Sequence, residues 1–589
     1  MLIALMGRLL QGHKAAVVAL LLLQLVQAGA TLLLPTINAA IIDDGIVAGD
    51  VSVISRLGLV MAAVAAVQAA AAIAAGYLGA VVAMKIGHGL RARIFDRIQA
   101  LSSQDVALFG AQSLTTRATN DTQQIQAFAL LVFTMFFAAP AMGVGGIALA
   151  LHQDAGLSAV VIAIVPLLVL IMYLIVRRLI PLYREGQDFL DRAGGILREQ
   201  IIGAMVIRAF VRQDHEVQRF AGVNRKLTAN NLQSALLVAG MLPLIMLVVN
   251  LSSVAVVWFG GHRIQAGQMN LGALTAFIAY ILQILLAIMM AMYVLMTAPR
   301  AAVCAERITA VLDAEPSVTD PGPAATAPRR FPAARHLQTP SRAAAVEFHN
   351  VGFSYPGAEA PVLAGISFTA APGTTTAILG STGSGKSTLL NLVPRFLDST
   401  SGRISLDGTD IKDLPLDGLR RSMSIVPQHS HLFSGTIAAN LRVAAPEATD
   451  SELWAALETA QTMRFMRDLP HGLETRVGQG GTSLSGGQRQ RLCIARALLR
   501  KAPLYLFDDS FSALDYATDV RLREALQSNL STATVIVVAE RISAVEAADL
   551  VLVLDGGHLV AQGTHLELLA GSATYREIAE SQLALDGRQ

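Results

Sequence analysis

The sequence predicts a multi-domain membrane protein: an all-α transmembrane half with six spanning helices, followed by an α/β half. Three observations indicate this fold class. Of the 589 residues, 53% are hydrophobic and only 15% are charged, whereas soluble domains carry about 25% charged residues. Mean hydropathy is +0.52, and the apolar residues concentrate before about residue 300. From about residue 345, short β-type runs alternate with helical patterns, as in mixed α/β domains.

Composition also excludes some classes of protein. The net charge is +2, and binding to a polyanion requires clustered Lys and Arg that displace counterions. We therefore expect no nucleic acid partner. The two cysteines, Cys304 and Cys493, lie far apart in the sequence and cannot form the disulfide framework of a small secreted domain. A reducing compartment is adequate for them.

Six apolar stretches reach the roughly 20 residues that a bilayer-spanning helix needs. They lie near residues 15–40, 56–83, 125–151, 156–182, 234–260 and 271–298. The first resembles a signal peptide, because cations precede it and small residues follow it. However, its apolar run from Ala15 through Leu34 is longer than a signal-peptide core, and five more spans follow.

The distribution of cations predicts the orientation. The segments after the second and fourth spans are rich in Lys and Arg, from Lys85 to Arg117 and from Arg177 to Lys226. The loop around Asp43, Asp44 and Asp50 and the loop at Gln153–Asp154 contain neither residue, and the last loop contains only Arg263. The positive-inside rule places the basic segments in the cytosol. We expect a multi-pass protein of the cell (inner or plasma) membrane with both termini in the cytosol.

The two basic segments keep helical apolar spacing and contain few turn residues. Ile94, Ile98 and Leu101 illustrate this spacing in the first segment. We interpret the segments as spanning helices that continue into the cytosol and turn over near Gly110–Thr116 and Arg208–Asp214. The alternative is that they are ordinary solvated loops, since charge runs are often exposed faces.

The chain divides into three predicted parts. Residues 1–312 form the transmembrane domain with its cytosolic extensions, and Ala301–Leu312 is a helix that leaves the membrane. Residues 313–344 contain Pro316, Pro321, Pro323, Pro328, Pro332 and Pro340 and are too proline-rich for a packed element, so they form a linker. Residues 345–589 form the α/β domain.

The α/β domain contains a phosphate-binding loop, which makes it an α/β P-loop nucleotide-binding domain. The apolar strand Thr376–Leu379 precedes the loop and the helix Leu389–Val393 follows it. Its glycines let backbone N–H groups curl around phosphate oxygens, Lys386 reaches the β- and γ-phosphates of ATP, and the Ser387 hydroxyl ligates Mg²⁺. The loop consists of Gly380, Ser381, Thr382, Gly383, Ser384, Gly385, Lys386, Ser387 and Thr388.

A magnesium site also needs a carboxylate at the end of a strand. The apolar run Leu504–Phe507 ends in Asp508, which is typical of a buried strand whose last side chain emerges near the phosphates. Alone, this pattern is common. Paired with the phosphate loop, it predicts that Asp508 and Ser387 hold the Mg²⁺ of bound ATP.

The residues between these two motifs resemble a known family. The run Leu484-Ser485-Gly486-Gly487-Gln488, followed by Arg489-Gln490-Arg491, is similar to the signature motif of ATP-binding cassette proteins. The resemblance implies that Tyr355 stacks on adenine, that Gln428 is the glutamine that senses Mg²⁺ and the membrane domain, and that Ser512–Asp515 is the D-loop. Six spans before one cassette resemble a half-transporter of the exporter type. In that family two cassettes pair head to tail, and each ATP lies between one phosphate loop and the other chain's signature motif.

Three positions depart from the family pattern. The usual general base is a Glu after the strand-end Asp, and this chain has Asp509. The shorter side chain sets its carboxylate about 1–1.5 Å back, and misplacement on that scale can cost about a hundredfold in rate. Glu540 stands where the family has a switch histidine, and an ionised Glu has no donor for the γ-phosphate. Gln479 replaces a Glu in the loop that touches the membrane domain's extensions.

The combination predicts a heterodimer. The signature motif is complete, and it serves the ATP of the partner chain, whereas Asp509 and Glu540 weaken hydrolysis at this chain's own site. We therefore expect a second half-transporter that carries Glu and His at these positions. Two alternatives remain: an importer on the same fold, for example for siderophore or lipid uptake, and an ATP-binding regulatory subunit that hydrolyses little.

The substrate is the least defined feature. Met289, Met290, Met292 and Met296 in the sixth span suit varied apolar ligands, but Met is also an ordinary gap filler. Polar span residues either face a cavity or hydrogen-bond helix to helix; they are Asn38, Gln68, Asn250 and Gln283. We expect a hydrophobic or amphipathic substrate, drug or lipid, alongside contact with membrane lipid.

Overall fold

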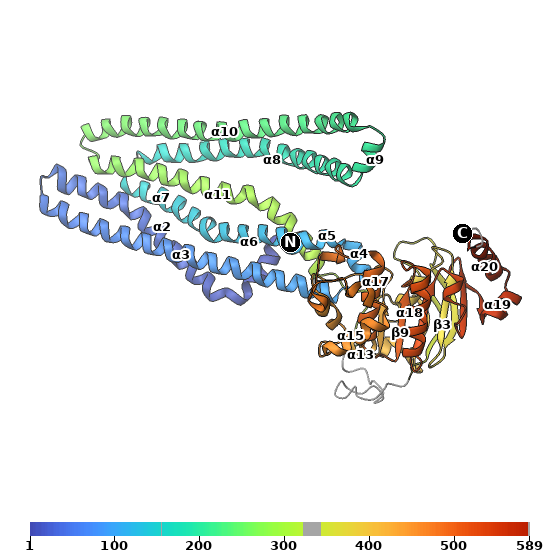
Figure 1. Ribbon diagram of the computed structural model, residues 1–589. Coiled ribbons are helices and arrows are strands. Elements are labelled where there is room, and N and C mark those ends of the chain that lie inside the picture. The colour runs from blue at the N-terminus through green and yellow to red at the C-terminus, as the bar shows by residue number, and fades with distance from the viewer. Residues whose placement is uncertain (155, 322–342, 587–589) are drawn as a thin grey trace. The chain divides into compact units, whose positions relative to one another are not determined.

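The computed structural model describes residues 1–154, 156–321 and 343–586 (Figure 1). Contacts divide the chain into two compact units. One unit comprises Met1–Gln99 and Ala111–Ala314, and the other comprises Ala100–Gly110 and Glu315–Gln589. Most of the predicted linker, residues 322–342, lies outside the described residues.

The first unit is entirely helical. Short π-helical turns at Ile41–Val47, Arg117–Asp121 and Val132–Phe136 interrupt some of its helices. Its helices are α1 (Leu2–Leu10), α2 (Lys14–Ala40), α3 (Val51–Ala100), α5 (Ala111–Thr116), α6 (Thr122–Leu131), α7 (Ala138–Gln153), α8 (Ser158–Ile202), α9 (Ala204–Ala209), α10 (Gln213–Gln265) and α11 (Leu271–Leu312).

The described residues contain six helical segments that are long and apolar enough to cross a membrane, as the sequence predicts. Each is 42 to 53 residues long. At 1.5 Å per residue a helix of this length measures about 63–80 Å, which is twice the roughly 30 Å hydrocarbon core of a bilayer. The basic segments after the second and fourth spans are therefore helical extensions rather than loops.

The chain reverses at both predicted places, with one shift. Helix α8 ends at Ile202 and α10 begins at Gln213, so the second reversal overlaps the predicted Arg208–Asp214. The first was predicted at Gly110–Thr116 but lies earlier, because Ala111–Thr116 is itself helical. Helix α4 (Ser103–Phe109) fills this reversal, begins with a capping box at Ser102 and ends at Gly110. Gly110 has a φ of 77°, a backbone conformation that favours glycine.

Long helices pack side by side in the first unit. Figure 1 shows α8 and α10 running alongside each other and joined by α9, while α11 packs against α2 and α7. Two of the polar span residues tie helices together: the Gln68 amide donates to the Thr31 hydroxyl at 2.9 Å, and the Gln283 amide donates to the Thr31 carbonyl at 3.0 Å. The helix-to-helix alternative therefore applies to Gln68 and Gln283.

The ATP-binding unit is built on one mixed sheet and two antiparallel sheets among its described residues. Its strands are β1 (Val346–Phe353), β2 (Leu363–Ala370), β3 (Thr375–Gly380), β4 (Ser401–Leu406), β5 (Thr409–Asp410), β6 (Met423–Val426), β7 (Gly435–Thr436), β8 (Arg476–Val477), β9 (Leu504–Asp508), β10 (Thr534–Ala539), β11 (Leu550–Asp555) and β12 (His558–Gly563). The largest described sheet has the order β12-β11-β3-β10-β9-β6, and a second has the order β2-β1-β4-β5. Strands β11, β3, β10, β9 and β6 pair in parallel.

Helices connect these strands. The helices of this unit beyond α4 are α12 (Lys386–Leu392), α13 (Leu416–Arg421), α14 (Ile437–Arg442), α15 (Asp450–Thr459), α16 (Met463–Met466), α17 (Gly486–Leu498), α18 (Tyr516–Asn529), α19 (His565–Gly571) and α20 (Ala573–Asp586). The strand β3 buries alternate residues in two different hydrophobic clusters, with Ala377 and Leu379 in one and Ile378 in the other. Both faces of the parallel sheet are thus covered, as parallel sheets require.

Candidate nucleotide-binding site

The predicted site residues follow four neighbouring parallel strands. The order β3-β10-β9-β6 places the phosphate loop, Glu540, Asp508 and Gln428 after successive strands. Carboxyl ends of parallel strands meet at one edge of a sheet, and ligands of open α/β sheets bind outside that edge. The fold thus brings together residues that lie up to 160 positions apart, as for Gly380 and Glu540.

The phosphate loop leaves β3 and enters α12, which begins at Lys386. Gly385 has a φ of 97°, and a Cβ atom on it would lie 2.8 Å from the Leu363 side chain, so this position needs glycine. The Lys386 ammonium is buried, and it donates to the carbonyls of Gly380 and Ser381 at 2.8 Å each. These contacts close the loop around the group that would meet the phosphates.

Ser387 and Asp508 form the predicted pair of magnesium ligands. The Ser387 hydroxyl donates to Asp508 Oδ1 at 2.8 Å. Burial raises the pKa of Asp508, as does the charge of Asp509, while the hydrogen bond from Ser387 opposes the shift. An oxygen pair of hydroxyl and carboxylate fits the ligand preference of Mg²⁺, which usually keeps several waters.

Asp509 occupies the base position on a strained turn. Its φ is 44°, in the left-handed region that residues other than glycine rarely adopt. Burial raises the pKa of its carboxyl, and the nearby charge of Glu540 raises it further, while hydrogen bonds from Ser512 and Gln428 lower it. Gln428 therefore faces the Asp509 carboxyl.

A buried glutamine that the sequence did not single out as a site residue holds this turn. Gln490 is 3% exposed on α17, and its amide donates to the Asp509 carbonyl at 3.2 Å. Its side-chain oxygen accepts from the Ala513 N–H at 3.3 Å. The helix that begins with the signature motif thus also holds the turn that carries Asp509.

Glu540 contacts the phosphate loop directly. Its Oε1 atom accepts a hydrogen bond from the Thr382 hydroxyl at 3.2 Å and lies 3.6 Å from Lys386 Nζ. The Glu540 side chain is 48% exposed, whereas that of Lys386 is 8% exposed. The Lys386 ammonium therefore interacts both with the loop carbonyls and with the Glu540 carboxylate. Glu540 stands at the position where the family carries histidine.

The remaining predicted residues occupy two further places. Tyr355 is exposed, and its hydroxyl lies 3.3 Å from the Thr388 hydroxyl beside the phosphate loop, where an aromatic ring can stack on a base. In the signature motif, Ser485 caps α17: its hydroxyl accepts from the Gln488 N–H, and the Gln488 side chain accepts from the Ser485 N–H. No described hydrogen bond joins the signature motif to the phosphate loop.

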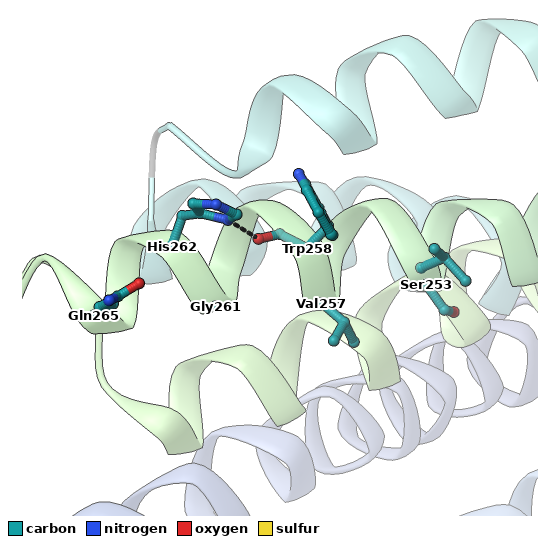
Figure 2. Close-up of a pocket in the computed structure, with 7 residues that line it drawn as sticks. Ser253, Val257, Trp258, Gly261, His262 and Gln265 are labelled. Carbon is teal, nitrogen blue, oxygen red and sulfur yellow. Dashed lines mark hydrogen bonds between the residues drawn. The ribbon is translucent and has the colours of Figure 1, made fainter.

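Hollows also occur on the membrane helices. One of about 550 Å³ lies along a single face of α10, and its lining includes Val257, Trp258 and His262 (Figure 2). The His262 Nδ1 atom lies at hydrogen-bonding distance, 2.8 Å, from the Trp258 carbonyl oxygen. Another hollow, of about 450 Å³, lies between α8 and α10. Because both are shallow and mostly apolar, they are surfaces for lipid or a neighbouring helix rather than enclosed sites.

Comparison with known proteins matches both units. Residues 17–289 match the ABC transporter transmembrane region, and residues 363–512 match the ABC transporter family. An uncharacterized ABC transporter ATP-binding protein of Mycobacterium tuberculosis is 44% identical over 585 residues, covering 99% of this chain and 98% of that protein. An ATP-dependent lipid A-core flippase of Chromobacterium violaceum is 32% identical over 544 residues, 92% of this chain and 91% of the flippase.

A solved structure has the same fold. It is the structure of a bacterial Atm1-family ABC exporter with ATP bound, with 26% sequence identity and a TM-score of 0.78. The alignment covers 97% of this chain and 98% of the exporter chain. The likeness therefore extends over the membrane helices and the ATP-binding unit alike.

We predict that Gln490 stabilises the ATP-binding unit. Replacing Gln490 by Leu leaves the Ala513 N–H without its partner and the Asp509 carbonyl with the Ser512 hydroxyl alone, which lowers the free energy of unfolding by about 1–3 kcal/mol. Trp454 packs against the core of this unit and reports its unfolding in urea by fluorescence, in a Trp258→Phe background. The control is Gln527→Leu on the exposed face of α18. Equal urea midpoints for the two variants would contradict the prediction.

Proposed function

Because the chain belongs to the ATP-binding cassette transporters of the exporter type, an ATPase-coupled and multi-pass membrane family, we propose that it is one half of a heterodimeric exporter. This chain supplies a degenerate ATP site and an intact signature motif to the site of its partner. The observation that carries the proposal is the presence of Asp509 and Glu540 beside the phosphate loop in a chain whose signature motif is complete.

Hydrolysis at this chain's own site is slow for two physical reasons. The Asp509 carboxylate is one methylene short of a Glu, and its turn is fixed by Gln490, so it does not advance toward the attacking water. Glu540 adds negative charge where a transition state also develops negative charge. Ser387 and Asp508, with Gln428 nearby, would hold Mg²⁺, which would neutralise charge on the phosphates.

Pairing with a different subunit resolves this weakness. Two copies of this chain would have Asp509 and Glu540 in both composite sites, and neither site would be well equipped. A second ABC half-transporter with Glu and His at those positions provides one competent site, completed by Ser485, Gly486, Gly487 and Gln488 of this chain. ATP in the degenerate site then remains bound and holds the cassettes together.

The helical extensions transmit the closure of the cassettes. ATP binding draws the two cassettes together, and the extensions of α3, α8 and α10 act as rigid levers on the spans. The cavity then changes from inward-facing to outward-facing, and hydrolysis at the competent site resets it. The exporter with ATP bound and the flippases among the relatives favour efflux over uptake.

We infer a lipid or another amphipathic molecule as substrate. The relatives include ATP-dependent lipid A-core flippases, and the spans are apolar with few charges. Met289 and Met292 pack against the hydrophobic cluster of the membrane unit, so these two fill gaps in the core. Among the polar span residues, Gln68 and Gln283 are engaged with Thr31. Selectivity therefore rests more on shape and apolar surface than on charge.

We predict that the degenerate site limits ATP hydrolysis. The purified chain alone shows little Mg²⁺-ATPase activity, and the double substitution Asp509→Glu with Glu540→His raises the rate by about a hundredfold, because it restores the base and a donor. The rate of phosphate release is measured for each variant in lipid nanodiscs, and the Lys386→Ala variant is the inactive control. Activity of the unsubstituted chain at ordinary exporter rates, abolished by Asp509→Asn, would refute the heterodimer.

A partner subunit also allows the regulatory alternative to be tested. If this chain is an exporter subunit, then Lys386→Ala in this chain leaves part of the transport activity of the pair, while the matching change in the partner stops it. If Lys386→Ala leaves transport by the pair at its full rate, while the matching change in the partner abolishes ATP turnover, this chain acts only as a regulatory subunit. In inside-out vesicles carrying the pair, an exporter accumulates substrate in the lumen, so ATP-dependent release of preloaded substrate from such vesicles would reverse the direction.

We predict that both termini face the cytosol. In the Ser52→Cys variant, the new cysteine lies in the first turn of α3. We expect it to react with a membrane-impermeant thiol reagent in intact cells, because this end of α3 lies outside. A cysteine at position 213, in Gln213→Cys, reacts only after permeabilisation. The native Cys304 and Cys493 are buried and give a low background. Labelling of Gln213→Cys in intact cells would reverse the assigned orientation.

A further inference from the structure

The C-terminal helix α20 contacts the segment that carries Glu540. The Gln582 side chain reaches this segment with both ends of its amide. Its Nε2 atom donates to the Glu540 carbonyl at 2.8 Å, and its Oε1 atom accepts from the Ile542 N–H at 2.8 Å. The backbone on both sides of Arg541 is therefore held by one side chain from 40 residues further along the chain.

Helix α20 is firmly seated, so it can act as a support. Tyr575 is 0% exposed and Ala579 is 2% exposed, and both belong to a hydrophobic core cluster of the ATP-binding unit. The Tyr575 hydroxyl lies 2.6 Å from His565 Nδ1. Burial raises the pKa of Tyr575 to about 12, so the phenol stays neutral. Residues 575, 579 and 582 are spaced along one face of the helix.

The other side of the same segment faces the phosphate loop. The backbone of Glu540 is held by Gln582, and its carboxylate meets the Thr382 hydroxyl at 3.2 Å and Lys386 Nζ at 3.6 Å. A continuous series of contacts thus runs from α20 through Glu540 to the phosphate loop. Strand β10 holds the backbone of Glu540 on one side and Gln582 holds it on the other. The Glu540 side chain is 48% exposed, and its hydrogen bond and ion pair are those with the phosphate loop.

The position of the Glu540 carboxylate affects the binding of ATP and the binding of ADP differently. The phosphate-loop lysine meets the β- and γ-phosphates of a bound nucleotide. An anion beside Lys386 repels the γ-phosphate of ATP, and ADP lacks that group. A carboxylate that is fixed in place repels more effectively than one that is free to swing into solvent, because the free one is screened.

We propose that Gln582 is a positioning residue for nucleotide selection: by fixing Glu540 against the phosphate loop, it lowers the affinity of this chain for ATP relative to ADP. The proposal rests on nucleotide binding by this chain and is independent of the identity of the partner subunit. It gives the C-terminal helix a role at the degenerate site, which no motif in the sequence indicates.

The test measures equilibrium binding of ATP and ADP, with Mg²⁺, to the full-length chain in lipid nanodiscs. The readout is the ratio of the two dissociation constants. Glu540→Gln tightens ATP relative to ADP by about tenfold, and Gln582→Leu does so by about threefold, since removing the hold weakens the repulsion without abolishing it. Gln582→Glu, which keeps the bond to the Ile542 N–H but loses the donor to the Glu540 carbonyl, falls between the unsubstituted chain and Gln582→Leu.

A double variant separates positioning from mere stabilisation. In the Glu540→Gln background, Gln582→Leu leaves the ATP-to-ADP ratio unchanged, because the charge it positions is gone. The matched control is Ser581→Ala, the exposed neighbour whose hydroxyl contacts only the Ile578 carbonyl among the described residues.

The outcomes discriminate among the proposals. An unchanged ratio in both Gln582→Leu and Gln582→Glu overturns the role of Gln582, as does an equal shift in the presence and absence of Glu540→Gln. If Gln582→Leu does not fold, Gln582→Glu against Ser581→Ala decides in the same way. Failure of the unsubstituted chain to bind any ATP overturns this inference and the proposed function together.

Discussion

The parallel pairing of β3 with β10, and of β10 with β9, determines where every acidic group of the site stands. Val538 pairs with Ile378 on one side and with Asp508 on the other, so the three strands end level with one another. The phosphate loop, Glu540 and Asp508 therefore emerge at one edge, although they are far apart in the sequence. A slip of one residue in this register would turn Asp508 to the other face of the sheet and separate it from Ser387.

The charges at this edge are the physical basis of the proposed slow turnover. Asp508, Asp509 and Glu540 all interact with one buried ammonium, Lys386, which is already engaged with two loop carbonyls. Burial raises the pKa of both aspartates, the charge of Asp509 raises that of Asp508 further, and the charge of Glu540 raises that of Asp509. A divalent cation would relieve this repulsion. In the proposed function, the same surplus of negative charge disfavours a further buildup of charge on the γ-phosphate, so a nucleotide binds with its metal but reacts slowly.

The sequence predicts those features that local patterns encode. Six apolar periodic runs, the glycine-rich loop and the strand-end Asp508 each depend on neighbouring residues. The structure has a long helical segment at each of the six runs, and it has the strand β3 and the helix α12 within a few residues of their predicted bounds. The first reversal lies earlier than predicted because the turn depends on the capping box at Ser102 and on Gly110, signals that the helical spacing of the flanking residues obscures. The contacts of Gln490 and Gln582 were not predicted because their partners lie 19 to 42 residues away, and neither the signature motif around Gln490 nor the sequence around Gln582 indicates them.

The reversal after α3 is held by a residue contact that spans a large distance in the sequence. Although it follows a membrane helix, the segment Ala100–Gly110 belongs to the ATP-binding unit. Within that unit, the Asp105 carboxylate accepts hydrogen bonds from the Ser317 N–H at 3.0 Å and from the Ser102 hydroxyl at 2.8 Å. Ser317 stands just after the helix α11 that leaves the membrane. One carboxylate thus fastens α4, the helix that follows α3, to the segment that follows α11. Two stretches of chain about 212 residues apart are held together by this side chain within one unit, and only a side chain that accepts several hydrogen bonds at once can do this.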